Sequence, residues 1–204
     1  TEAARVCNLD VLKWIAAEPA LGTELLMRTN ALGDTIAIAA VESRKDGIIA
    51  ILQWIYDQPA LGPALLRQPN ADGDTIATFA ALPPSRPAVF DWILSAPGLG
   101  TDLLRRPNAA GNTIATYAAT FGYTAILQWI ADTPGLGLPF LSQVHSNGDT
   151  IVTAAASSMK GETALQWIVE TPDLGITFLL QEKRAPLAVI AARSGSVNVL
   201  RWIA

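Results

Sequence analysis

Cysteine and histidine are almost absent from this chain of 204 residues, which has one of each, Cys7 and His145. A single cysteine excludes an internal disulfide and is typical of proteins in a reducing compartment. The sequence also lacks a glycine-rich phosphate loop, a zinc-ligand spacing and a paired-carboxylate motif. We therefore expect no enzymatic activity, no metal and no cofactor.

Charged residues are scarce as well, at 16% of the chain, and they sum to a net charge of −4. With half of the residues hydrophobic, this composition excludes a disordered chain and favours a folded core. Basic residues do not outnumber acidic ones, which argues against a nucleic-acid partner, because a nucleic-acid-binding protein needs clustered Lys and Arg. The longest apolar stretch, at 47–56, is too short to cross a bilayer, so we expect no membrane association.

The segment after Thr1 does not have the pattern of a secretory leader, in which basic residues are followed by an apolar stretch. We therefore expect an excised or processed piece of a longer protein. Together with the single cysteine, this favours the cytoplasm, or the cytosol of a host cell if the protein is delivered there.

What the sequence contains instead is an internal repeat. Tryptophan recurs at intervals of 35 to 40 residues, and proline follows the first five tryptophans after five residues. The tryptophans are Trp14, Trp54, Trp92, Trp129, Trp167 and Trp202. Fixed spacing indicates packed structure, and variable spacing indicates exposed loops. We predict one domain over 1–204 with units at about 1–29, 30–69, 70–107, 108–144, 145–183 and 184–204, of which the first and last are incomplete.

Three units begin with Asn-x-x-Gly, at Asn30, Asn70 and Asn108, which predicts a turn. Asp or Asn and then Thr follow, and their side-chain oxygens can accept hydrogen bonds from the first free amides of a helix. A second helix is expected after the variable loop, as at 123–133, where Ile126, Trp129 and Ile130 share one face. The segment 97–108 predicts one further helical turn. Each unit is thus two helices and a short third element, which gives an all-α protein.

The segment "GNTIATYAATFGYTAILQWI" at 111–130 resembles the ankyrin repeat in its Gly, Thr, Ala-Ala, second Gly and closing apolar pairs. Residues 191–203 match the second half of that pattern, and residues 3–15 match it with Cys7 in place of the glycine. The chain departs from it where Pro-Leu-His becomes Ile-Ala-Thr and where tryptophan replaces a leucine. The resemblance implies a right-handed solenoid of helix pairs, here with an extra helical turn in each repeat because the period exceeds 33.

Armadillo-type and Pumilio-type repeats have similar periods and remain the alternative folds. Pumilio-type arrays bind RNA through basic and stacking side chains at regular positions of one helix. This acidic chain offers no such column.

The stretch "NADGDTIATFAA" at 70–81 has the acidic and amide residues of a calcium loop. An EF-hand loop, however, has glycine sixth and glutamate twelfth. Here glycine is fourth and Ala81 is twelfth, so we predict only a turn and a helix cap. His145 occupies the position of Asn30, Asn70 and Asn108 in other units and is likewise predicted to be a turn residue. More than three stacked units would separate it from Cys7, which excludes a catalytic dyad.

The tryptophans could form either an exposed ladder or a core seam. Each of them precedes an isoleucine and follows another apolar residue at helical spacing, which favours the core seam. The threonine pairs of the units are best explained as helix caps.

Three functions stay open. The first is a monomeric, non-catalytic scaffold that binds a partner protein on its concave face. The second is a targeting or substrate-recognition arm of a larger enzyme or bacterial effector, and the third is a nucleic-acid-binding repeat, which the charge disfavours. The ankyrin-like resemblance places the concave face on turn tips and first-helix ends. The matching residues are Leu32, Asp34, Asp72, Asp74, Asn112, Phe121, Tyr123, Asn147 and Asp149. The acids among them are either helix caps or a ridge of carboxylates. In the second case we expect a partner segment with basic residues around an apolar anchor.

Overall fold

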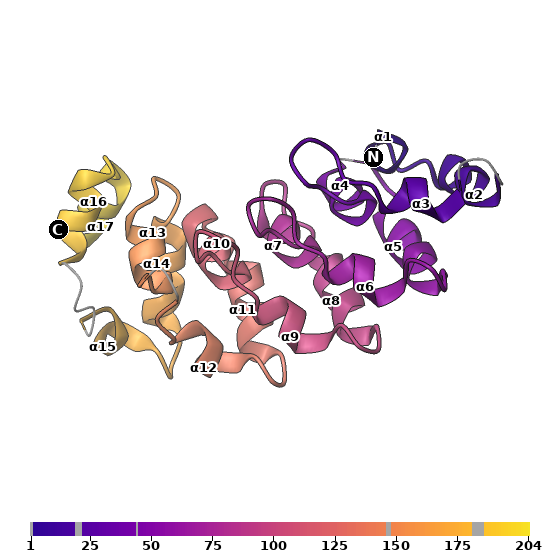
Figure 1. The fold of residues 1–204 in the computed structure, drawn as a ribbon. Helices are drawn as coiled ribbons and strands as arrows, with labels where there is room; N and C mark the ends of the chain where they lie inside the picture. The colour runs from indigo at the N-terminus through magenta and orange to yellow at the C-terminus, as the bar shows by residue number, and fades with distance from the viewer. Residues whose placement is uncertain (1, 19–21, 44, 146–147, 181–185) are drawn as a thin grey trace. The chain divides into compact units, whose positions relative to one another are not determined.

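The computed structural model describes residues 2–18, 22–43, 45–145, 148–180 and 186–204 (Figure 1). These residues form 17 helices and no strand, which confirms the prediction of an all-α protein. The chain divides into two compact units, Thr1–Ala110 and Gly111–Ala204. No helix of the described part is long and apolar enough to cross a membrane.

The first unit repeats one order of elements: a helix after the turn, a longer helix that carries the tryptophan, and a short third helix. Its helices are α1 (Glu2–Arg5), α2 (Leu9–Ala17), α3 (Gly22–Met27), α4 (Ile36–Glu42), α5 (Ile48–Asp57), α6 (Gly62–Arg67), α7 (Ile76–Ala81), α8 (Pro87–Ser95) and α9 (Gly100–Arg105). Equivalent helices lie next to each other, since α4 packs against α7 and α5 packs against α8. The first unit is therefore built by stacking of repeats.

The second unit continues the same order with α10 (Ile114–Phe121), α11 (Thr124–Asp132), α12 (Gly137–Leu141), α13 (Ile151–Ala156), α14 (Glu162–Glu170), α15 (Gly175–Leu180), α16 (Leu187–Arg193) and α17 (Val197–Ile203). Helix α13 packs against α10 on one side and α16 on the other, and α14 packs against α11 and α17. Repeats stack here as they do in the first unit.

The helix that follows each turn begins at a threonine. Thr35, Thr75, Thr113 and Thr150 each accept a hydrogen bond from the amide three residues later. In the last three cases the hydroxyl oxygen of the second threonine accepts a hydrogen bond from the backbone amide of the first, which completes a capping box. Each cap stabilises its helix by about 1 kcal/mol. The prediction that these threonines cap the helices is confirmed.

In the four central repeats the isoleucine after the tryptophan fills the core more completely than the tryptophan itself. Ile55, Ile93, Ile130 and Ile168 are fully buried. Among the tryptophans only Trp92 is buried, at 7% exposure, whereas Trp14 is 60% exposed and the other four are half-buried. The prediction of a tryptophan core seam is thus wrong for Trp14 and only partly met by the half-buried ones.

The indole rings lie at the edge of the core because their N–H groups reach the preceding repeat. The Trp92 indole N–H donates to the side-chain oxygen of Gln53 at 3.0 Å. Trp167 makes the same bond to Gln128 at 3.2 Å, and Trp202 makes it to Gln166 at 2.8 Å. An indole N–H that leaves water needs such a partner, and in these three repeats the partner is a glutamine of the preceding repeat.

Candidate partner-binding surfaces

The turn asparagines of the first unit link each loop to the loop before it. The Asn70 side-chain oxygen accepts the amides of Asp72 at 3.0 Å and Asp74 at 2.9 Å. Its amide group donates to a carboxylate oxygen of Asp34 at 2.8 Å, in the preceding loop. Asn108 donates in the same way to Asp74 at 2.9 Å. One side chain therefore closes its own turn and joins two repeats.

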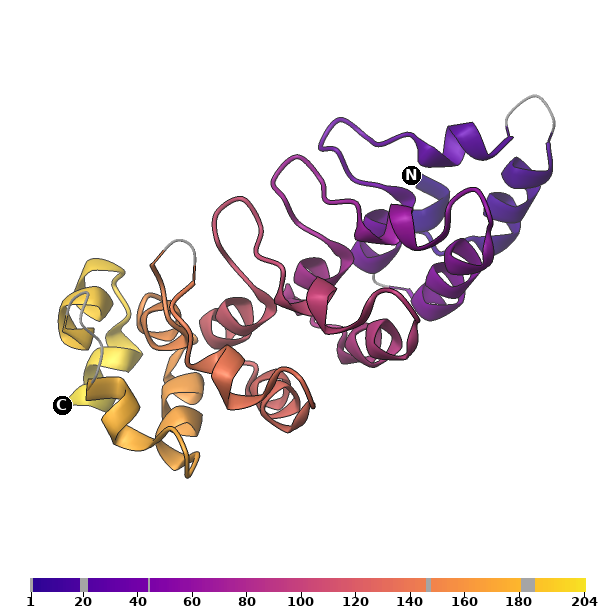
Figure 2. The ribbon, with the colours of Figure 1, turned by 60° about the horizontal axis from the view of Figure 1, so that its bottom comes forward.

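Backbone contacts reinforce this link between loops. The amide of Ala71 donates to the carbonyl of Leu32 at 3.1 Å, and the amide of Ala109 donates to that of Asp72 at 2.9 Å. The approach is close: a Cβ atom on Gly73 would lie 2.5 Å from the amide nitrogen of Ala109. Figures 1 and 2 both show the α3–α4 and α6–α7 loops side by side. We call this hydrogen-bonded row of turns, at residues 30–34, 70–74 and 108–109, the loop ridge.

Burial separates the predicted tip residues of the first unit into two groups. Asp34 and Asp74 are only 4% and 8% exposed, and their carboxylates bind asparagines of the loop ridge. The expectation that Asp34 and Asp74 cap helices or present free carboxylates is therefore wrong. Threonines cap the helices, and asparagine side chains donate hydrogen bonds to the two carboxylates. Leu32 and Asp72 face solvent at the tips, with Leu32 64% exposed.

The predicted tip residues of the second unit are less exposed than Leu32. Asn112 and Asp149 are half-buried. A carboxylate oxygen of Asp149 accepts the hydroxyl of Thr153 at 3.3 Å, so this acid faces the start of α13. Asn147 lies outside the described residues.

The predicted Phe121 and Tyr123 belong to a larger aromatic group in the second unit. The ring of Phe121 lies 6.3 Å from that of Tyr117, nearly parallel to it, and 5.9 Å from that of Tyr123. All three side chains are half-buried. The sequence analysis missed Tyr117, although its position four residues before Phe121 places both on one face of α10. We call Tyr117, Phe121 and Tyr123 the aromatic surface.

A tight turn fixes the aromatic surface. Gly122 ends α10 in the left-handed conformation, at φ 69°. A Cβ atom there would lie 2.4 Å from the carbonyl oxygen of Lys160. The hydroxyl of Thr163 also donates to the Gly122 carbonyl at 3.2 Å. The next repeat therefore holds the turn that orients two of the three rings.

His145 lies in a turn, as predicted. The amide of Gly148 donates to the His145 carbonyl at 2.8 Å, and the His145 amide donates to the Asp149 carbonyl at 2.7 Å. The ring is 6% exposed, and its edge contacts Phe140 with ring centroids 6.1 Å apart. Burial lowers the pKa of His145, and the charge of Asp149 opposes that shift. The buried Nε2 atom makes no hydrogen bond.

Among the described residues, no group of three or more His, Cys, Asp and Glu side chains is placed to hold a metal ion. Neither a protein-family model nor a curated protein matches this chain.

Proposed function

We propose that this chain is a protein-binding scaffold whose aromatic surface anchors a partner protein. The observation that carries the proposal is the group of three adjacent rings, which lie half-buried on α10 and in the turn after it. Aromatic side chains supply large contact areas and dominate the binding energy of many protein interfaces. The two tyrosines add hydroxyl groups that can bind the polar rim of a partner.

The support beneath the rings favours binding over mere packing. Helix α10 begins at a complete capping box on Thr113 and packs against α11 and α13. Gly122 fixes its other end. A surface held at both ends loses little conformational entropy when a partner binds, so more of the contact energy appears as affinity.

We further propose that the repeats are ankyrin-like units of a right-handed solenoid and that the partner binds on its concave face. The order of turn, helix pair and short helix in both units supports this proposal. The loop ridge supports it as well, because rigid turns in a row provide a recognition surface. Leu32 and Asp72 are its exposed tips, an apolar and an acidic one. With a net charge of −4, the chain suits a partner segment that combines an apolar anchor with basic residues.

A random peptide library panned against the full chain tests the aromatic surface. We expect the enriched peptides to contain an apolar residue with flanking Lys or Arg. Phe121→Ala should weaken their binding at least tenfold, measured by fluorescence anisotropy, because a central aromatic hot spot contributes about 2 kcal/mol or more. Trp14→Ala is the control: it removes an aromatic ring that is 60% exposed and lies outside the aromatic surface, and it should change the affinity less than twofold.

Circular dichroism should first confirm that both variants keep the helical content of the wild type. If no enriched peptide distinguishes Phe121→Ala from Trp14→Ala, the aromatic surface is not the binding site.

A further inference from the structure

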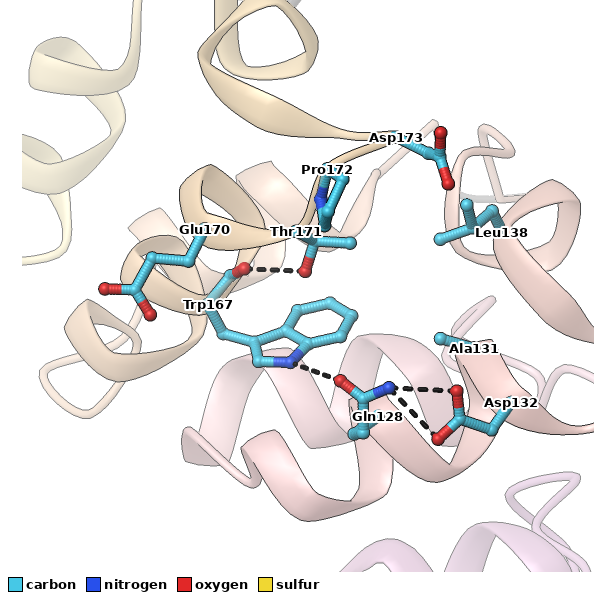
Figure 3. Close-up of a pocket in the computed structure, with 9 residues that line it drawn as sticks. All are labelled: Gln128, Ala131, Asp132, Leu138, Trp167, Glu170, Thr171, Pro172 and Asp173. Carbon is cyan, nitrogen blue, oxygen red and sulfur yellow. Dashed lines mark hydrogen bonds between the residues drawn. The ribbon is translucent and has the colours of Figure 1, made fainter.

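A cavity of about 440 Å³ lies beside Trp167 in the second unit (Figure 3). The indole forms one wall, Ala131 and Leu138 face it, and Pro172 covers one side. The indole N–H is bound to Gln128, whose amide group donates to both carboxylate oxygens of Asp132, at 2.9 and 3.0 Å. The aromatic wall is thus held in place while its face borders an open space.

The first unit contains the equivalent place, and there it is filled. Tyr56 stands two residues after its tryptophan, where the second unit has Ala131. The ring of Tyr56 meets that of Trp92 edge to face, with centroids 6.3 Å apart. Its hydroxyl donates to the carbonyl of Pro97 at 3.0 Å. The cavity at Trp167 is therefore the space that a tyrosine occupies in the sister repeat.

An arginine closes the same place in the first unit. The Arg67 guanidinium of α6 donates to the carbonyl of Gly98, just after Pro97. At the position of Arg67 the second unit has Ser142, which is too short to reach across. At the position of Gly98 it has Asp173. The second unit has thus lost both a filling ring and a cation, and it has gained a carboxylate.

The charge of the cavity is acidic. Asp132 and Asp173 are exposed on its rim, and Glu170 lines it from the other side of the indole, where its carboxylate accepts the Gln166 amide at 2.6 Å. Among the residues that the structure describes, no Lys or Arg lines the cavity. An empty space with an aromatic wall and uncompensated carboxylates is complementary to a planar cation.

We infer that this cavity, which we call the Trp167 pocket, binds an arginine side chain of the partner protein. The guanidinium would stack on the indole face while its N–H groups donate to Asp132 and Asp173. Leu138 and Pro172 would contact the aliphatic part of the side chain. The inference rests on the proposed protein-binding role and adds a second, charged contact to the aromatic surface.

The test uses the ¹⁵N-labelled full chain and the blocked amino acid Nα-acetylarginine amide. We expect a saturable shift of the Trp167 indole N–H signal during titration, while the Trp92 signal stays unchanged because Tyr56 already fills its site. Nα-acetylcitrulline amide, which has the same shape without the charge, should bind roughly tenfold more weakly, since both the cation–π contact and the ion pairs are lost.

Three variants of the full chain complete the test. Ala131→Tyr restores the ring found in the first unit and should abolish the shift. Asp173→Asn changes only an exposed side chain and should weaken binding severalfold. Phe121→Ala should leave the titration unchanged, so failure of the aromatic surface and failure of the Trp167 pocket are distinguishable. Equal binding of the arginine and citrulline probes, equal shifts of Trp92 and Trp167, or no saturable shift would overturn the inference.

Discussion

Replacement of Asn70 by alanine should strongly destabilise the first unit, because one side chain holds together two loops. The substitution removes the two hydrogen bonds to the Asp72 and Asp74 amides, each contributing about 1 kcal/mol. It also removes the bond to Asp34, and a bond to a charged group contributes about 1.5–3 kcal/mol. Asp34 is only 4% exposed and keeps one donor, Asn30, at 2.8 Å. We therefore expect the free energy of unfolding to fall by about 3–5 kcal/mol.

Urea unfolding followed by circular dichroism at 222 nm measures this change. Asn198→Ala is the matched control, because Asn198 is exposed on α17 and the same substitution there should change stability by less than about 0.5 kcal/mol. Asn70→Asp separates the two contributions: it keeps the acceptor that closes the turn but replaces the donor to Asp34 with a second carboxylate. It should therefore destabilise the chain even though the turn is preserved. A loss below about 1 kcal/mol for Asn70→Ala, or wild-type stability for Asn70→Asp, would refute the role assigned to the loop ridge.

Three further predictions concern the same packing. Trp92→Ala should cost about 3–5 kcal/mol of unfolding free energy, whereas Trp14→Ala should cost less than about 1 kcal/mol, since only Trp92 is buried. Gly73→Ala and Gly98→Ala both place alanine at a positive φ, of 77° and 82°, but only Gly73 faces a neighbouring loop, so its substitution should lower the thermal midpoint further. His145→Asn should remove an acid-sensitive part of the stability. Burial lowers the pKa of His145 in the folded state below its ordinary value of 6.5, so the unfolded state takes up the proton first and wild-type stability falls as the pH drops below that value. Equal pH dependence of the two proteins between pH 7.5 and 5.5 would contradict this.

The sequence predicted what depends on neighbours along the chain. Threonine after an Asn-x-x-Gly turn caps a helix through an amide three residues away, so Thr75 and Thr113 could be interpreted without tertiary structure. Cys7 was matched to a repeat glycine, and it has a left-handed backbone at φ 52°, close to the 69° of Gly122. The order of helices followed from spacing for the same reason.

What the sequence did not show depends on contacts between repeats. Asp34 resembles a helix cap by its position, yet its carboxylate binds Asn70, 36 residues away. Trp14 has apolar neighbours along the chain, yet it is 60% exposed, because burial depends on the packing of other segments and not on sequence neighbours alone. The Trp167 pocket arises from a small residue, Ala131, where the sister repeat has a tyrosine, and such a vacancy appears only when the helices are placed.

The most direct test of the proposed function is the affinity of one library-selected basic peptide for the wild type, Phe121→Ala and Trp14→Ala, measured side by side by fluorescence anisotropy at low and high salt. We predict that Phe121→Ala weakens binding at least tenfold at both salt concentrations, that Trp14→Ala matches the wild type, and that salt weakens binding to all three proteins. Equal affinity of Phe121→Ala and the wild type at both salt concentrations would contradict the proposal that the aromatic surface anchors the partner.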